Sequence, residues 1–118
     1  MMTVVKEISK EEVNKVKNAN VTYDSIKDVF CTLIKTNEND TDFLNSAAFK
    51  LYEEKQEKAK VAFDTEKSFI EKNYVPDIVR NNGCSWSLDY NTCIISVVFE
   101  DNEESLQALK NEGYIERI

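Results

Sequence analysis

The sequence predicts an α+β fold, on the strength of three observations. Residues before position 75 carry apolar side chains at helical spacing, residues 84–99 have the alternation and β-branched content of two strands, and a short helix and a strand follow them. Because helices and strands are segregated along the chain, we expect the helices to pack on a small antiparallel sheet. The length of 118 residues predicts a single domain, 1–118.

The first helix is predicted to begin at Ser9 and to reach about residue 19. Ser9 and Glu12 have the spacing of a capping box, and Ile8 and Val13 have that of the hydrophobic staple around it. A second helix is predicted from about residue 22 to residue 34. Its apolar residues fall on one face with the helical period: Ile26, Val29, Phe30, Leu33 and Ile34.

A long helix is predicted over about 42–74, which contains neither proline nor glycine. Lys55 and Lys58, in the charged stretch 53–58, interrupt its apolar stripe. Such a stretch is typical of a helical turn that projects past the core into solvent. Two alternatives are that the helix breaks here into two antiparallel helices, or that it packs on a second copy of the chain. The stripe consists of Leu44, Ala48, Leu51, Ala59, Ala62, Phe63, Phe69 and Ile70.

A β-hairpin is predicted over 84–99, after Pro76 has ended the long helix and Gly83 has closed a short helical turn. Asn91 and Thr92 are its expected two-residue turn. The resulting register places the apolar residues of both strands on one core-facing side and leaves a mixed, partly covered side.

The end of the chain is predicted to complete a three-stranded sheet. A helix near 102–112 has Leu106 and Leu109 at inward positions and ends at Gly113, and a strand follows over 114–118.

The composition excludes most catalytic and cofactor chemistry. With no histidine, two glycines and one proline, the chain lacks the imidazole of Ser-His and Cys-His nucleophiles and the glycine clusters of phosphate-binding loops. The cysteines at positions 31, 84 and 93 have no C-x-x-C spacing, so we expect reduced thiols and no metal site. The prediction is therefore a non-catalytic protein without a cofactor.

The net charge of −7 and the absence of a basic patch argue against direct binding of nucleic acid. No segment is long and apolar enough to span a membrane, and the N-terminus becomes charged before a signal region can form. We therefore expect a cytoplasmic protein that does not bind membranes. The lysine and asparagine bias is typical of AT-rich genomes, such as those of low-GC bacteria and their phages.

A contact surface is predicted from three kinds of residue. Tyrosine is enriched at protein interfaces, two lysines interrupt the apolar stripe, and one carboxylate lies on a predicted strand. The predicted partner contacts are Tyr52, Lys55, Lys58, Tyr74, Asp89 and Tyr90.

These features predict a small acidic protein-interaction or accessory module that binds a protein partner or forms a homodimer through the long helix. Two alternatives stay open. One is an acidic inhibitor, of the phage or mobile-element type, that mimics nucleic acid on a basic protein. The other is a small-molecule-binding domain with an apolar pocket between the long helix and Trp86.

Overall fold

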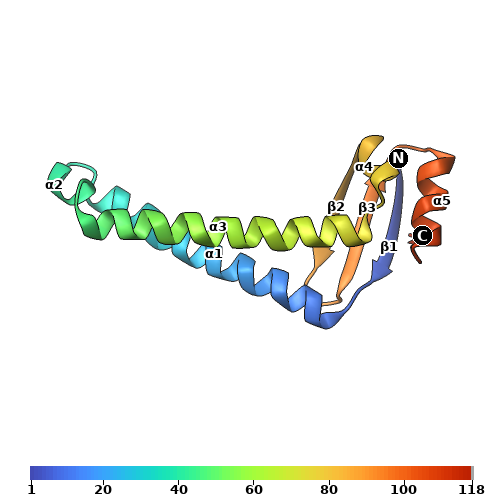
Figure 1. Cartoon of the computed structure of the whole chain (residues 1–118), viewed down its shortest axis with the longest axis horizontal. Helices are drawn as coiled ribbons and strands as arrows, with labels where there is room; N and C mark the ends of the chain where they lie inside the picture. Colours follow the sequence, from blue (N-terminus) through green and yellow to red (C-terminus); the bar gives the residue numbers. More distant parts are fainter. Residues whose placement is uncertain (118) are drawn as a thin grey trace. The chain divides into compact units, whose positions relative to one another are not determined.

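The computed structural model describes residues 1–117 and confirms the predicted α+β class (Figure 1). The chain divides into two compact units, which we call the sheet unit (Met1–Lys15 with the chain from Lys67 onward) and the hairpin unit (Val16–Glu66). Helices α1 and α3 each have residues in both units. The elements are β1 (Met2–Glu7), α1 (Lys10–Thr36), α2 (Thr41–Leu44), α3 (Ala47–Tyr74), α4 (Asp77–Asn81), β2 (Cys84–Asp89), β3 (Ile94–Phe99), α5 (Glu103–Asn111) and β4 (Ile115–Glu116).

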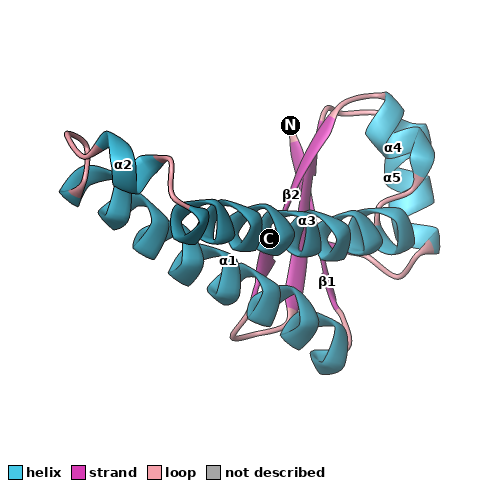
Figure 2. Ribbon diagram, turned by 60° about the vertical axis from the view of Figure 1, so that its left-hand side comes forward, coloured by secondary structure: helices cyan, strands magenta, loops and turns pink. Residues whose placement is uncertain are grey.

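The sheet unit contains a four-stranded antiparallel sheet with the strand order β2-β3-β1-β4 (Figure 2). The prediction of three strands was wrong, because β1 lies between β3 and β4. Its strand signal is short: Thr3, Val4 and Val5 are β-branched, but the charged Lys6 and Glu7 follow at once. The pairing with β3, which runs from Met2 opposite Phe99 to Glu7 opposite Ile94, decides the structure of this segment.

One face of the sheet forms the core of the sheet unit. Val4, Ile95, Val97 and Phe99 are at most 1% exposed. Helices of the same unit add Ile70, Val79 and Leu109, and the segment between α3 and α4 adds Val75. On the other face the polar side chains of β2 are exposed, whereas Ile94, Ser96 and Val98 of β3 are half-buried. This one-sided burial agrees with the predicted register of the hairpin.

Helix α1 is a single helix of 27 residues, so the prediction of separate helices over 9–19 and 22–34 was wrong. The segment Asn20-Val21-Thr22 lowers helix propensity, but it contains neither glycine nor proline, and half-buried residues continue across it. The predicted start is nearly correct. The Val13 amide donates to the Ser9 carbonyl at 3.0 Å, and Ile8 and Val13 are both buried.

The prediction of one helix over 42–74 was wrong at its start, because α2 and α3 are separated by two residues. Each has its own side-chain cap: Asp40 accepts from the Phe43 amide at 3.0 Å, and Ser46 Oγ accepts from the Phe49 amide at 3.2 Å. From there α3 is continuous for 28 residues. The charged stretch 53–58 therefore does not break the helix.

The β2–β3 hairpin has the predicted register, with Trp86 opposite Val97. Its turn differs from the prediction, because four residues, 90–93, join the strands. The Asn91-Thr92 pair does not form a primed turn. The positive φ of 60° falls instead on Cys93, whose amide donates to the Asp89 carbonyl at 2.9 Å.

Helix α5 begins and ends within one residue of the predicted bounds. Asn102 caps it by accepting from the Ser105 amide at 3.0 Å, and Gly113 follows it with a φ of 96°. Leu109 is fully buried and Leu106 half-buried. The predicted last strand is confirmed for the two residues of β4; residue 118 lies outside the described residues.

Candidate interaction surface

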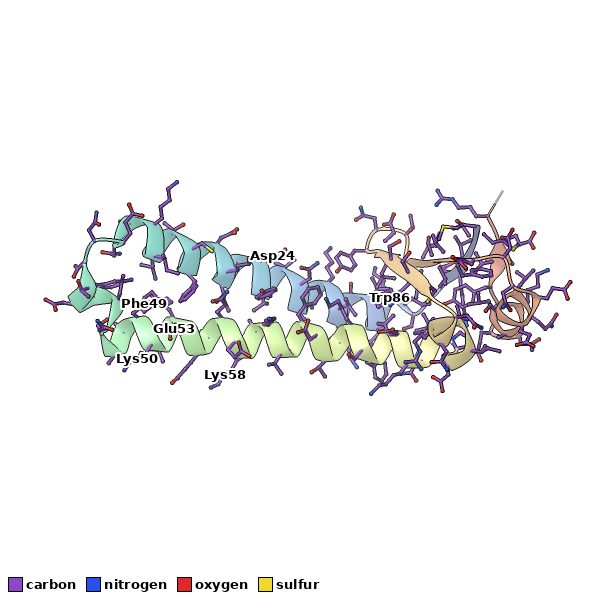
Figure 3. All side chains as sticks on the ribbon, turned by 90° about the horizontal axis from the view of Figure 1, so that it is seen from above. Asp24, Phe49, Lys50, Glu53, Lys58 and Trp86 are labelled. Atoms are coloured by element: carbon purple, nitrogen blue, oxygen red, sulfur yellow. The ribbon has the colours of Figure 1, made fainter. Side chains whose placement is uncertain are left out.

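The hairpin unit is held together by one apolar seam between α1 and α3. Aromatic rings mark the seam: Tyr23 and Phe63 have centroids 6.1 Å apart, and Phe30 stacks on Phe49 at 5.3 Å. Phe43, from α2, meets the edge of the Phe49 ring at 5.8 Å. Figure 3 shows Phe49 between the two helices. The seam uses every third or fourth residue, which is the pattern of two long helices packed side by side.

A second set of apolar residues on the hairpin unit remains exposed. Val29 and Ile34, on the predicted apolar face of a helix, and Leu51, in the predicted apolar stripe, are 49%, 39% and 53% exposed. Val21 and Val61 are more than half exposed. They are exposed because the helical period identifies an apolar face without showing that a neighbour covers it.

An apolar groove lies on one side of this seam. It has a volume of about 420 Å³ and is lined by Ser25, Ile26 and Val29 of α1 and by Tyr52 and Lys55 of α3. The Lys55 ammonium lies 5.6 Å from the centre of the Tyr52 ring, within the range of a cation–π contact. The structure therefore brings two of the predicted contact residues together in one groove.

Lys58 is exposed one helical turn beyond Lys55. In Figure 3 it lies on the side of α3 that is turned away from α1. The groove residues of α1 were not among the predicted contacts, because Ile26 and Val29 were assigned only to the apolar face of a helix and Ser25 has no distinctive pattern. One feature of the sequence does mark this side of α1: positions 22, 25, 29 and 32 lie on it, and none of them carries a charged residue.

Tyr74 belongs to a different cluster, in the sheet unit. Its hydroxyl donates to the Glu12 carboxylate, and its backbone carbonyl accepts from the Tyr114 hydroxyl at 2.9 Å. The Lys6 ammonium lies 5.3 Å from the Tyr74 ring centre and 5.9 Å from that of Tyr114. These contacts join α1, the end of α3, β1 and the segment before β4, so Tyr74 has a structural role in this unit.

The two tyrosine hydroxyls of this cluster hold their protons tightly. Burial raises the pKa of Tyr74 to about 12, helped by the hydrogen bond to Glu12 and by its negative charge. The pKa of Tyr114 is raised as well, first by burial and then by the charge of Glu112. Both hydroxyls are therefore neutral hydrogen-bond donors at neutral pH, and neither is an activated nucleophile.

Asp89 acts in the hairpin turn. Its carboxylate accepts hydrogen bonds from the amides of Asn91 at 2.8 Å and Thr92 at 3.2 Å, and these bonds lower the pKa of Asp89. The neighbouring Tyr90 is half-buried. These bonds account for the position of Asp89 without a partner protein.

The cysteines and carboxylates of the described residues form no recognisable reactive centre. All three cysteines are free thiols. Burial and the negative charge of Glu71 raise the pKa of the half-buried Cys84, although Arg80 opposes this. The thiol is therefore protonated at neutral pH, which disfavours a nucleophilic role.

Across residues 1–117, no three His, Cys, Asp or Glu side chains are grouped in a way that could hold a metal ion. Within the same residues, no helix has the length and apolar content needed to cross a membrane.

No protein family model, curated protein or solved structure matches this chain. In class, it is an α+β protein in which a two-helix hairpin is inserted between strands β1 and β2 of an antiparallel sheet.

Proposed function

We propose that this chain is a non-catalytic protein-interaction module and that its contact surface lies on the hairpin unit. The observation that carries the proposal is the apolar groove of that unit, whose lining includes Ile26, the half-exposed Val29 and Tyr52. An apolar groove of this kind is typical of a binding site. A homodimer through the long helix is one form that this interaction can take.

The rest of the molecule supports a binding role over a catalytic one. The neutral Tyr74 and Tyr114 hydroxyls and the protonated Cys84 thiol are unsuited to nucleophilic catalysis. The three free cysteines support a reducing compartment, and we propose the cytoplasm.

Photo-crosslinking in cells of the source organism tests the proposal. A photoreactive amino acid introduced at Val29 should form adducts with another protein chain. The matched control is the same amino acid at Cys31, which is also exposed and lies about 200° round the helix from Val29. Equal adduct formation at the two positions, or none at Val29, would contradict the proposed surface.

A further inference from the structure

We propose that two copies of this chain associate through the outer edge of strand β2, so that their sheets join into one continuous antiparallel sheet. The surface involved, which we call the β2 edge, is the side of Cys84–Asp89 that faces away from β3. This inference goes beyond the proposed function, because it concerns the sheet unit and uses none of the groove residues of the hairpin unit.

The hydrogen bonds of the sheet decide which backbone groups of β2 face outward. The Ile8 amide donates to the Cys93 carbonyl at 2.8 Å, one step beyond the paired residues of β1 and β3. Because hydrogen-bonded pairs alternate along an antiparallel ladder, odd-numbered residues of β3 bond to β1 and even-numbered ones bond to β2. The β2 partners of the even-numbered residues are Ser85, Ser87 and Asp89. The residues whose amides and carbonyls point away from β3 are therefore Cys84, Trp86 and Leu88.

A hydrogen bond on the far side of β1 gives the same alternation. The Arg117 amide donates to the Thr3 carbonyl at 3.0 Å, so odd-numbered residues of β1 bond toward β4 and even-numbered ones toward β3. No hydrogen bond from elsewhere in residues 1–117 reaches the three outward amides and three outward carbonyls of β2. These groups are donors and acceptors with which another strand can pair.

The β2 edge lacks the features that keep sheet edges from pairing. Proteins block such edges with very short strands, with lysine or proline, or with bulges. Strand β2 has six residues, contains neither lysine nor proline, and pairs with β3 without a bulge. At the opposite edge β4 has only two residues, one of which is the charged Glu116. The sheet is therefore protected at the β4 edge and open at the β2 edge.

The sequence of β2 complements a second copy of itself. When the outward residues of two antiparallel β2 strands pair, the two-fold axis lies at Trp86, which faces Trp86 of the other copy. Cys84 then faces Leu88, and Ser85 faces Ser87. This register places half-buried side chains opposite half-buried ones and exposed serines opposite exposed serines. It also gives every outward amide and carbonyl of both strands a partner.

The charge distribution also favours a second copy at this edge. The chain has a net charge of −7, so two copies repel each other in general. Residues 84–88 carry no charge, and Asp89 is the one charged residue of β2. In the proposed register Asp89 faces Gly83, and the two Asp89 residues are roughly 20 Å apart. That separation exceeds the screening length of about 8 Å at physiological ionic strength, so their repulsion is weak.

The first test measures the oligomeric state of the full chain and locates the contact. Sedimentation velocity over a wide range of concentration should show an equilibrium between monomer and dimer. Amide hydrogen exchange of the Trp86 amide should slow as the fraction of dimer rises, because this amide becomes bonded only in the dimer. The Ser85 and Ser87 amides already bond to β3 and should change less.

Two matched variants test the register. Ser85→Lys/Ser87→Lys places lysine opposite lysine at the dimer contact, whereas Ser85→Lys/Ser87→Glu places lysine opposite glutamate. Both positions are exposed in the single chain, so both variants should keep the wild-type circular dichroism. Each dimer contains two of these cross-strand pairs, so we expect the first variant to dimerise about tenfold or more weakly than the second. General repulsion does not explain this order, because the first variant has the smaller net negative charge.

Three outcomes would overturn the inference. They are a chain that stays monomeric at every concentration, equal dimerisation of the two variants, and a dimer in which the Trp86 amide gains no protection. The last outcome would assign self-association to another surface, such as the long helix. Crosslinking at Val29 judges the proposed function separately, and an absence of those crosslinks would leave this inference intact.

Discussion

The sheet unit and the hairpin unit bury their apolar residues to different extents. Of the fourteen buried hydrophobic residues at positions 1–117, eleven lie in the sheet unit and three, Val16, Phe49 and Ala59, in the hairpin unit. A sheet covered by helices encloses side chains from several directions, whereas two helices meet along a single seam. A two-helix hairpin therefore leaves apolar residues outside its seam, and we expect the sheet unit to contribute more to stability than the hairpin unit.

The largest expected effect is at the centre of the sheet unit. Phe99 is 1% exposed in β3, so Phe99→Ala should lower the free energy of unfolding by about 3–5 kcal/mol through lost burial and a cavity. Urea denaturation measures this loss. The control is Phe69→Ala on α3, which should cost much less because Phe69 is 48% exposed. Similar losses for the two variants would show that burial in the sheet core is not what makes Phe99 important for stability.

A second substitution distinguishes local from global unfolding. Phe49→Ala removes the ring that contacts both Phe30 and Phe43, with an expected loss of about 3 kcal/mol confined to the hairpin unit. Amide hydrogen exchange should accelerate near residues 26–56 while the β1 and β3 amides keep their protection. Equal acceleration in β1 and β3 would mean that the two units unfold as one.

A smaller effect is expected at Tyr74. Tyr74→Phe leaves the Glu12 carboxylate without this donor and should cost about 1 kcal/mol at pH 7. Folding raises the Tyr74 pKa from 10.0 to about 12, so the folded state holds this proton more tightly than the unfolded state. Its stabilising contribution is full below pH 10 and is lost as the pH rises through about 12.

Melting temperatures between pH 8 and pH 12 measure that dependence. The wild-type chain should lose stability more steeply above pH 10 than Tyr74→Phe, because the two chains differ only in the Tyr74 hydroxyl. Parallel curves would exclude a contribution from this hydroxyl.

The smallest effect is expected at Asp89. Asp89→Ala removes the acceptor for two turn amides, and the loss of stability should be less than that of Tyr74→Phe because the carboxylate is exposed. The lowered pKa of Asp89 means that its contribution is full above the ordinary aspartate pKa and disappears as the pH falls through the lowered value. A variant as stable as wild type at pH 7 and at pH 3 would show that the turn does not depend on this side chain.

The sequence predicts the elements better than it predicts their ends and neighbours. Helix caps depend on residues that are close in the chain, so helix ends with clear caps were predicted well. The ends of α5 at Asn102 and Gly113 and the start of α1 at Ser9 are examples. The β1 strand was missed because its partner β3 lies at the other end of the chain. The break before α3 depends on Ser46, a single cap in a segment without glycine or proline.

The groove residues were also predicted only in part, because local spacing shows which residues share one helix but not which helix packs beside it. Tyr52 and Lys55 share a helix face, so their spacing alone places them together. Ser25 and Val29 complete the groove from α1, and that pairing of two helices is set by the seam of aromatic rings, which no local pattern specifies. Tyr74 and Asp89 were chosen by residue type, and the structure assigns them to internal contacts.

The placement of β1 also has a kinetic consequence. Met2 pairs with Phe99, so the central strand pair must close a loop of almost the whole chain, which is slow for a flexible segment. The two helices between them shorten that search. Phe30 and Phe49 meet across a short connection, and pairing that extends from there brings Glu12 and Tyr74 together. We therefore expect early formation of the helix pair to speed closure of the sheet.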